Sequence, residues 1–274
     1  DDKVTENALF EIGSASKTFT AIAILQLIEE GKLSLKTTLD TFYPKGEITK
    51  LANYKGKNYW DKVTVEMLLH HTSGFIDYLN VYGSDEKALK IFNDPTKIYS
   101  FDEILKLAID CGDANFIPGE RFNYSNTGYI ILGDIISKVS KMNWRKYIQK
   151  NILKKAEMKH TYFGSSISKK AKMNMPKGYY SQKRTEIPPT LAGSAGEIIS
   201  NLEDLKVFLK MWDAGKFFKN PETIQNQFTK GFKQMYPGSD VLRYGYGVMK
   251  INGFMGHAGQ TFGFQAYMGI HPKT

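Results

Sequence analysis

The chain has 274 residues, of which 42% are hydrophobic and 24% charged, and its mean hydropathy is −0.37. This composition is typical of a folded soluble domain and excludes a mainly disordered chain. The net charge of +9 would suit anionic partners, but we find no aromatic-and-basic repeat of a nucleic-acid module and expect no nucleic-acid partner. The single cysteine, Cys111, excludes an intrachain disulfide and a thiolate metal cluster.

The chain begins with a predicted strand that leads into a buried helix. Residues 9–12 read as a short strand, and residues 17–30 are apolar at nearly every position, with Gly31 where a helix stop is expected. The longest apolar stretch, residues 21–28, contains Gln26 and is far shorter than the ~20 residues that cross a bilayer. The first residues lack the order of a secretory signal, so we expect any such signal to lie outside this sequence.

The middle of the chain is predicted to be mainly helical. Helical patterns cover residues 65–70, 128–139 and 144–153. Ser100 to Glu103 and Ser200 to Glu203 each match a capping box, and an amphipathic pattern follows each of them. The polar residues 169–184 are the most loop-like stretch.

The end of the chain is predicted to be β-structure. Residues 244–251 and 254–259 read as two strands joined by Asn252-Gly253, the strongest short hairpin dipeptide, and residues 264–270 read as a third strand. We predict an α/β (α+β sandwich) fold in which both ends of the chain join one antiparallel sheet flanked by helices. Residues 1–55 and 190–274 would form this discontinuous domain, and residues 56–189 an inserted, mainly helical domain.

The first candidate site is Ser14-Ala-Ser-Lys17 at the start of the buried helix. Residues three apart lie on the same helix face, so the Lys17 amine can reach the Ser14 hydroxyl. A helix N-terminus stabilises negative charge, and burial lowers a lysine pKa enough for the amine to act as a base. Ser166 to Lys169 repeats the spacing, but it lies in a polar stretch without apolar periodicity.

Two further segments carry candidate chemistry. Tyr124 and Asn126 are two residues apart in a loop, so in an extended backbone their side chains project to the same side. The phenol of Tyr124 could transfer a proton, and the carboxamide of Asn126 could bind a substrate amide. Tyr78-Leu-Asn80 has the same pattern. His257 lies between glycines in Gly256-His-Ala-Gly-Gln260 on a predicted strand, where Gly259 would allow another chain to approach closely.

Together the three segments resemble the serine beta-lactamase and penicillin-binding-protein superfamily, especially its class C beta-lactamase, D-alanyl-D-alanine carboxypeptidase and esterase branch. The resemblance is carried by Phe10-Glu-Ile-Gly-Ser-Ala-Ser-Lys-Thr-Phe, Leu68-Leu-His-His-Thr-Ser-Gly and Gly256-His-Ala-Gly-Gln-Thr-Phe-Gly-Phe. It extends over nearly the whole chain. Neither the Ser-Asp-Asn segment nor the deacylating glutamate motif of class A is present.

The resemblance implies roles for named residues. Ser14 would be acylated, Lys17 and Tyr124 would transfer its proton, and the backbone N–H groups of Ser14 and Gln260 would form the oxyanion hole. Asn126, His257 and Gly259 would contact the substrate, with His257 in the place of the lysine of the family's Lys-Thr-Gly triad.

Two departures from the family pattern bear on the substrate and the fold. Ala258 replaces a hydroxyl residue that in many members helps to hold the substrate carboxylate. This replacement favours ester or unusual peptide substrates over beta-lactams and D-Ala-D-Ala peptides. We also expect the N-terminal strands and the C-terminal helix of the family fold to be missing here.

We therefore predict a serine hydrolase, related to enzymes of the cell wall, that acts by an acyl-enzyme on an amide, lactam or ester carbonyl. A D-Ala-D-Ala carboxypeptidase-like enzyme is first, with a small-ester esterase or a non-catalytic binding homologue of the same fold as alternatives. The resemblance implies no metal or cofactor, a small-molecule or peptide substrate, export to the periplasm or outer face, and at most weak association with an anionic cell-envelope surface. The sequence does not indicate an oligomeric state.

Overall fold

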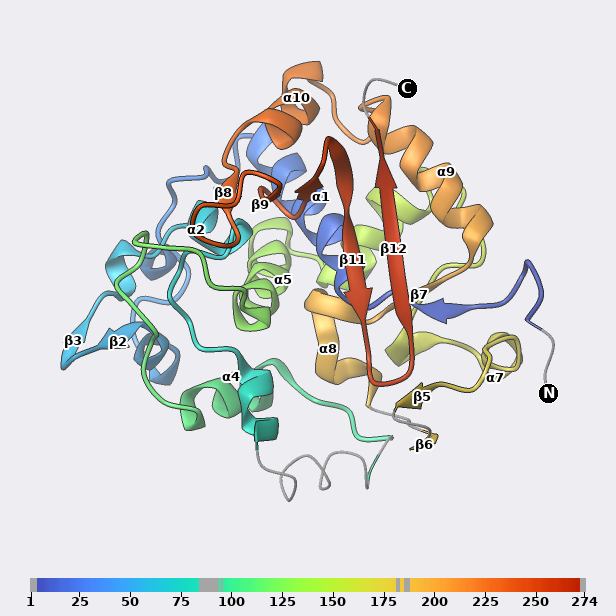
Figure 1. Ribbon diagram of the computed structural model, residues 1–274. Coiled ribbons are helices and arrows are strands. Elements are labelled where there is room, and N and C mark those ends of the chain that lie inside the picture. The colour runs from blue at the N-terminus through green and yellow to red at the C-terminus, as the bar shows by residue number, and fades with distance from the viewer. Residues whose placement is uncertain (1–3, 84–93, 95, 181–182, 185–187, 272–274) are drawn as a thin grey trace.

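The protein combines a layer of helices with antiparallel sheets (Figure 1). The computed structural model describes residues 4–83, 94, 96–180, 183–184 and 188–271. The α-helices in these ranges are α1 (Ser16–Glu29), α2 (Val65–Leu69), α4 (Phe101–Asp110), α5 (Asn126–Ser140), α6 (Trp144–Ile148), α7 (Lys169–Lys172), α8 (Pro189–Gly196), α9 (Leu202–Asp213) and α10 (Pro221–Thr229).

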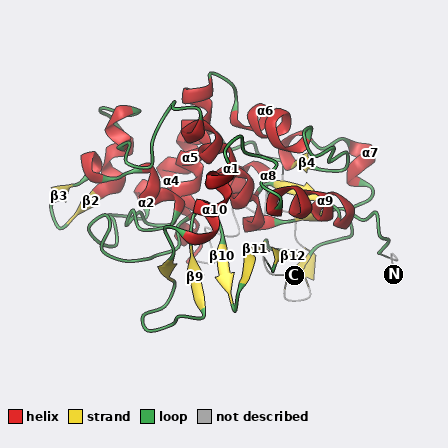
Figure 2. Cartoon of the chain, turned by 90° about the horizontal axis from the view of Figure 1, so that it is seen from above, coloured by secondary structure: helices red, strands yellow, loops and turns green. Residues whose placement is uncertain are grey.

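The largest sheet of the described residues has five antiparallel strands in the order β12-β11-β10-β9-β8. Its strands are β8 (Lys233–Gln234), β9 (Leu242–Tyr244), β10 (Met249–Ile251), β11 (Phe254–Gln260) and β12 (Gln265–Ile270). Seen from above, β9 to β12 lie on one side of the molecule and most helices on the other (Figure 2). Asn252 and Gly253 both have positive φ, as the predicted hairpin turn between β10 and β11 requires.

Shorter strands form three small sheets among the described residues. A three-stranded sheet has the order β1-β7-β4, made of β1 (Phe10–Glu11), β7 (Ile198–Ser200) and β4 (Tyr162–Phe163). Two hairpins pair β2 (Asn53–Tyr54) with β3 (Lys57–Asn58) and β5 (Tyr179–Tyr180) with β6 (Lys183–Arg184).

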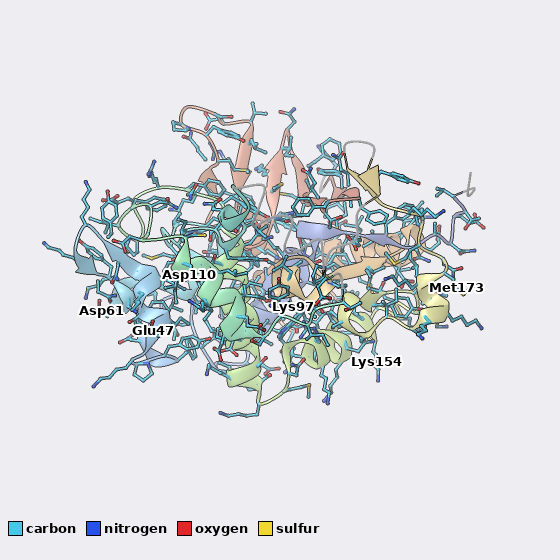
Figure 3. All side chains as sticks on the ribbon, turned by 90° about the horizontal axis from the view of Figure 1, so that it is seen from below. Glu47, Asp61, Lys97, Asp110, Lys154 and Met173 are labelled. Atoms are coloured by element: carbon cyan, nitrogen blue, oxygen red, sulfur yellow. The ribbon has the colours of Figure 1, made fainter. Side chains whose placement is uncertain are left out.

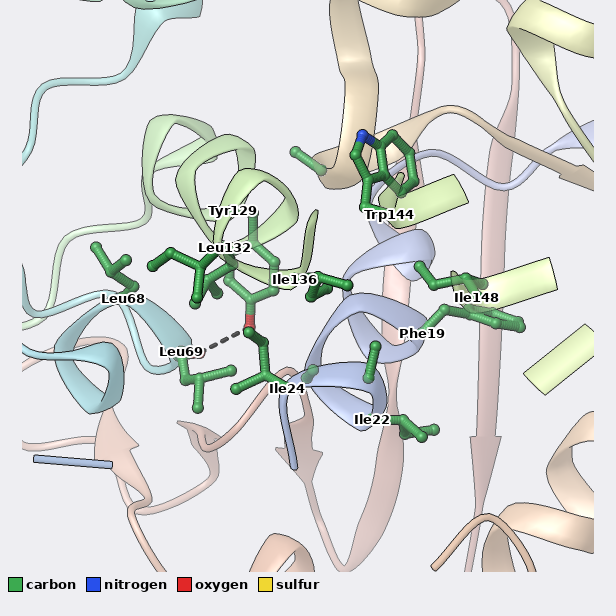
Figure 4. Packing of buried hydrophobic residues seen from close by; sticks show 14 of the residues in the cluster. Phe19, Ile22, Ile24, Leu68, Leu69, Tyr129, Leu132, Ile136, Trp144 and Ile148 are labelled. Carbon is green, nitrogen blue, oxygen red and sulfur yellow. Dashed lines mark hydrogen bonds between the residues drawn. The ribbon is translucent and has the colours of Figure 1, made fainter. Parts of the chain in front are cut away.

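Helix α1 runs through the centre of the hydrophobic core. Its residues from Ser16 to Leu27 are all buried, because α5, α6 and α8 pack around it and β11 covers another side. The Phe19 and Phe208 rings stack with centroids 4.1 Å apart. Tyr129 lies in the same core, and its hydroxyl donates to the carbonyl oxygen of Leu69 at 2.7 Å (Figure 4). The buried environment that the sequence predicts for Lys17 is therefore present.

Several exposed charged side chains lie on the side of the molecule away from the five-stranded sheet. Glu47, Asp61 and Lys154 are exposed there (Figure 3). In the described ranges, no helix is both long enough and apolar enough to span a membrane.

The mixed fold of helices and antiparallel sheets is as predicted, but three details were wrong. The N-terminal strand β1 pairs with β7 and not with the C-terminal sheet, although Phe10 and Phe264 bring the two sheets into contact at a ring distance of 6.1 Å. Residues 244–251 form the end of β9, a turn with Gly247 at φ 70° and β10, so they are not one strand. Residues 169–184 contain α7, β5 and β6, so they are less loop-like than predicted.

The two predicted capping boxes have different outcomes. Ser100 and Glu103 form a complete box at the start of α4. Helix α9, however, is capped by Asn201, whose side chain accepts from the N–H of Asp204. Ser200 ends β7, and its hydroxyl bonds to Thr161, so it is not available as a cap.

One continuous hydrophobic cluster includes residues from both predicted domains, for example Phe19 and Phe208 from one and Ile131 from the other. The division into residues 1–55 with 190–274 and residues 56–189 stays a prediction.

Candidate active site

Ser14 lies in a tight 3₁₀ turn, Gly13–Ala15, immediately before α1. Gly13 has φ 51°, in the left-handed region that favours glycine. A Cβ on Gly13 would lie 2.8 Å from the backbone nitrogen of Gln260, closer than real Cβ contacts allow. Glycine therefore lets the Ser14 turn lie directly against strand β11.

Lys17 is one turn further along the chain, and its side chain is completely buried. Its Nζ atom donates to Ser14 Oγ at 3.0 Å, to Asn126 Oδ1 at 2.7 Å and to the carbonyl oxygen of Ala195 at 2.8 Å. These three acceptors match the three donors of an ammonium group. Burial lowers the pKa of Lys17 from 10.5 to about 7, although the charge of Asp77 raises it. The amine can therefore exchange a proton with Ser14 near neutral pH.

Tyr124 lies beside this pair, on the loop that precedes α5. The Lys17 Nζ atom is 4.9 Å from the centroid of the Tyr124 ring. Burial raises the pKa of Tyr124 well above 10, and Ser14 offsets part of the rise. The contact with Ser14 does not meet the geometry of a hydrogen bond, and the buried Tyr124 hydroxyl has no other partner in the described ranges. Tyr124 is thus a neutral phenol with a proton to donate.

The segment Leu68–Gly74 forms the platform that holds the Tyr124 loop. His71 has φ 59°, its carbonyl oxygen accepts from the N–H of Asn123, and its Nδ1 atom accepts from the N–H of Ser125. Burial holds the pKa of His71 well below 6.5, so the ring is neutral and Nδ1 can act as an acceptor. The rings of His71 and Tyr124 have centroids 4.2 Å apart. His71 therefore positions Tyr124 through its hydrogen bonds to the loop and its contact with the Tyr124 ring.

His70, the C-terminal cap residue of α2, contacts the Thr72 hydroxyl through Nδ1. In the described part of the chain, no three or more His, Cys, Asp or Glu side chains are grouped so as to hold a metal ion.

Asn126 is the first residue of α5, and its amide connects Lys17 to an acid. Its oxygen accepts from Lys17, while its Nδ2 atom donates to Asp77 Oδ2 at 2.8 Å. The backbone N–H of Asn126 donates to the same oxygen at 3.0 Å. Asp77 thus belongs to the site, although sequence reasoning did not single it out.

Strand β11 forms the opposite wall of the site. A Cβ on Gly259 would lie 1.8 Å from the carbonyl oxygen of Ile12, so only glycine allows this approach. Together with Gly13, it places the backbone of Gln260 next to the Ser14 turn, where two N–H groups can face one oxyanion.

His257 is fully buried in this wall. Its Nδ1 atom contacts the carbonyl oxygen of Ala258 and must carry the proton, so Nε2 accepts from the Tyr244 hydroxyl at 2.8 Å. Burial lowers the pKa of His257 to about 3, and the charge of Lys17 lowers it further, so the ring is neutral. The His257 and Tyr124 rings have centroids 6.5 Å apart. Since both ring nitrogens are engaged, His257 supports the wall behind Tyr124 in this structure.

A pocket of about 130 Å³ opens onto Ser14. Its polar lining includes Ser14, Asn126 and Gln260, and its apolar wall includes Leu79, Leu191 and Phe262. The pocket therefore presents a nucleophile, a carboxamide and an apolar surface to one bound molecule.

The structure brings most of the predicted site residues together and separates the second Ser-x-x-Lys sequence from them. Ser14, Lys17, Asn126, Gly259 and Gln260 surround the mouth of α1 with Tyr124 beside them and His257 behind. By contrast, Ser166 and Lys169 are exposed around the start of α7. Tyr78, from the repeated Tyr-x-Asn pattern, lines the Ser14 pocket, and its hydroxyl donates to the carbonyl oxygen of Leu191.

Sequence reasoning missed Asp77 and the Ala195 carbonyl as partners. Asp77 lies three residues after the Leu68–Gly74 segment, which was the available signal, whereas a backbone acceptor cannot be recognised from the sequence.

Comparison with known proteins places this geometry in context. Residues 1–274 match the family model described as "Beta-lactamase". Protein flp of Staphylococcus aureus strain MRSA252 is 34% identical over 167 residues, which cover 61% of this chain and 30% of that protein. Penicillin-binding protein 4* of Bacillus subtilis is 35% identical over 156 residues, which cover 57% of this chain and 30% of that protein. The match thus spans less than a third of the length of these relatives.

Solved structures share the fold over nearly the whole chain. A D-stereospecific amidohydrolase from Streptomyces sp. has a TM-score of 0.84 at 25% identity, covering 97% of this chain and 79% of that one. The penicillin-binding protein of Bacillus halodurans has a TM-score of 0.76 at 26% identity, covering 98% and 79%. A D-amino acid amidase from Ochrobactrum anthropi SV3, in complex with L-phenylalanine, has a TM-score of 0.81 at 23% identity, covering 98% and 75%.

Proposed function

The chain belongs to the beta-lactamase family of serine hydrolases, and from this premise we propose that it hydrolyses an amide bond through an acyl-enzyme on Ser14, with a D-amino-acid residue as the acyl group. The observation that carries the proposal is the buried Lys17 amine 3.0 Å from the Ser14 hydroxyl, with a pKa of about 7. A lysine in this environment is uncharged in a substantial fraction of molecules at neutral pH and can act as a base.

The pKa directions divide the proton transfers between two residues. Neutral Lys17 accepts the Ser14 proton as Ser14 Oγ bonds to the substrate carbonyl carbon. Tyr124 keeps its proton because burial raises its pKa, so it is suited to donate that proton to the leaving nitrogen as the carbon–nitrogen bond breaks. The Lys17 ammonium next to the phenol ring then returns the proton to Tyr124.

The oxyanion of the tetrahedral intermediate would face the N–H groups of Ser14 and Gln260. Water then attacks the ester carbonyl of the acyl-enzyme and gives a proton to Lys17. As the carbon–Oγ bond breaks and the acid leaves, Lys17 returns that proton to Ser14 Oγ.

Two features of the site favour a neutral amide with an apolar side chain, and the D configuration is proposed by analogy with solved proteins of this fold. The apolar wall of Leu79, Leu191 and Phe262 suits an uncharged side chain. Ala258 has no hydroxyl group to hold a terminal carboxylate, so a neutral amide is favoured over a free peptide C-terminus. Solved proteins of this fold that are named for D-stereospecific amide hydrolysis support the same substrate class.

An ester is the second candidate, because an acyl-enzyme on Ser14 can also form from an ester, and Ala258 has no hydroxyl group that would favour a substrate with a free carboxylate. We also propose that the enzyme acts outside the cytoplasm, on amides related to the cell wall, as the family resemblance implies.

Turnover of matched substrates tests the proposal. We expect the chain to hydrolyse D-phenylalanine amide and D-alanine amide faster than their L-enantiomers and faster than a D-Ala-D-Ala peptide, and the Ser14→Ala variant to be inactive on all of them. Rapid turnover of a short-chain ester, without turnover of any of the D-amides, would show that the protein is an esterase and would overturn the proposal. If the folded chain turned over no amide, peptide, penicillin or ester, the hypothesis of a non-catalytic binding homologue would be favoured.

A further inference from the structure

Asp77 lies outside the residues that carry out the proposed reaction, yet its hydrogen bonds converge on them. Oδ2 accepts from both the backbone N–H and the side-chain Nδ2 of Asn126, at 3.0 and 2.8 Å. Oδ1 accepts from the N–H of Leu79 at 2.9 Å. Asp77 is therefore held by the loop on one side and by the start of α5 on the other.

These contacts decide which way the Asn126 amide faces. A carboxylate can only accept hydrogen bonds, so the amide nitrogen must point toward Asp77. The amide oxygen is then left to accept from Lys17 at 2.7 Å. Nδ2 carries a second hydrogen, and Asn126 lines the pocket next to Ser14, so that hydrogen can donate to a substrate carbonyl. The reversed amide would present its oxygen to Asp77 and its nitrogen to the Lys17 ammonium, and both contacts would be repulsive.

We propose that Asp77 is a positioning residue, which fixes the Asn126 amide between Lys17 and the substrate and supplies a negative charge to the site through that amide. The proposal rests on the proposed function for its catalytic consequence, but not for its structural one.

The charge of Asp77 opposes the effect of burial on Lys17. The titratable side chains facing Lys17 are Asp77 from the loop after α2, Tyr124 from the loop before α5, Tyr129 from α5, His71 from the end of α2 and His257 from β11. Burial keeps the two tyrosines and the two histidines neutral, so among these groups Asp77 carries the negative charge. Without that charge, the pKa of Lys17 would fall below about 7.

Two substitutions separate the charge from the orientation. Asp77→Asn keeps the size of the side chain and removes the charge, and Asp77→Ala also removes the acceptor that orients Asn126. We expect Asp77→Asn to move the Lys17 titration and the acidic limb of the pH–rate profile to lower pH. We expect Asp77→Ala to lower kcat/KM by about 10- to 100-fold, as for a misplaced contact in an active site, and to have little further effect in an Asn126→Ala background.

Asp204 supplies a matched control. It also accepts from a backbone N–H, that of His160 at 2.8 Å, and from a side chain, the Thr161 hydroxyl at 2.7 Å. It lies in the first turn of α9, however, and is not among the groups that shift the pKa of Lys17. Asp204→Asn should lower the melting temperature and leave the Lys17 titration unchanged.

The decisive measurement is an NMR titration of the Lys17 side chain in protein labelled at the lysine Cε, in wild type, Asp77→Asn and Asp204→Asn. A shift of the Lys17 titration to lower pH in Asp77→Asn alone supports the proposal. Equal Lys17 titrations in all three proteins, or a full additional loss from Asp77→Ala in the Asn126→Ala background, would overturn it. The titration needs no substrate, so a failure of the proposed function would show only as wild-type protein without turnover.

Discussion

The close approach of strand β11 to the Ser14 turn gives the sharpest structural prediction, because it depends on Gly259. A Cβ at this position would lie 1.8 Å from the carbonyl oxygen of Ile12, and real Cβ atoms essentially never come closer than 3.0 Å. Gly259→Ala must therefore move the strand and the turn apart by at least about 1.2 Å. Both contacts are backbone, so no flexible side chain can absorb the shift.

This displacement would move the N–H of Gln260 away from the oxyanion at Ser14. Loss of one such donor reduces the rate by about 10²- to 10³-fold. We expect that reduction in the acylation rate of Gly259→Ala, measured by stopped-flow with a fluorescent penicillin or by initial rates with a D-amino acid amide, and scaled to the folded fraction from circular dichroism.

Gly128→Ala is the matched control. A Cβ at Gly128 would lie 3.5 Å from Leu68 Cδ2, an ordinary contact, and the residue lies inside α5, where alanine is favoured over glycine by up to about 1 kcal/mol. The control should keep wild-type activity. A Gly259→Ala protein with wild-type acylation rate and melting temperature would show that the strand does not press on the turn as described.

Three further predictions concern stability. The pKa of Lys17 is about 7 in the folded chain and 10.5 when exposed, so between these values the unfolded chain binds one more proton than the folded chain. The free energy of unfolding should therefore rise by about 2 kcal/mol from pH 7 to pH 9, and urea unfolding of Lys17→Met should lack this rise. Burial lowers the pKa of His70 to about 4, so as the pH falls from 6.5 to 4 the unfolded state binds a proton at His70 that the folded state does not, and the free energy of unfolding should fall. In His70→Asn the slope of the free energy of unfolding against pH should decrease by the equivalent of about one proton, and an unchanged slope would contradict the assignment. Arg145 binds the fully buried Glu197 carboxylate through Nε and Nη2, so Arg145→Ala should lower the free energy of unfolding by about 3–5 kcal/mol. Arg243→Ala, which removes an exposed ion pair, should lower it by less than about 1 kcal/mol. Equal losses in urea unfolding would refute the distinction.

Local patterns in the sequence predicted the features that depend on neighbouring residues. Asn252-Gly253 predicts its turn because both positions need positive φ, and Ser100 with Glu103 predicts a cap because both partners lie within one turn. Competition between nearby residues is harder to read. At α9, the hydroxyl of Ser200 is engaged by Thr161 in the neighbouring strand region, and Asn201 becomes the cap.

The site shows the same division between local and distant contacts. The spacing of Ser14 and Lys17 predicts their contact, since both lie within one helical turn. The partner of β1 and the role of Asp77 depend on segments far apart in the chain, at Ile199 and Asn126, which no single stretch of sequence specifies. The spacing of Tyr124 and Asn126 made them candidates and the family resemblance gave them roles and added Gln260, but neither identified the acid that orients Asn126.

The central claim is that Ser14 is the nucleophile, and the most direct test is to locate the acyl group on the chain. After incubation with a penicillin or an activated D-amino acid ester and digestion with trypsin, we predict one added acyl group on the peptide of residues 4–17, which is lost in Ser14→Ala. In Lys17→Met, where the loss of the lysine extends the corresponding peptide to residues 4–32, we predict strongly reduced acylation. An adduct on the peptide of residues 160–169, which holds the second Ser-x-x-Lys sequence, or an adduct that persists in Ser14→Ala, would contradict it.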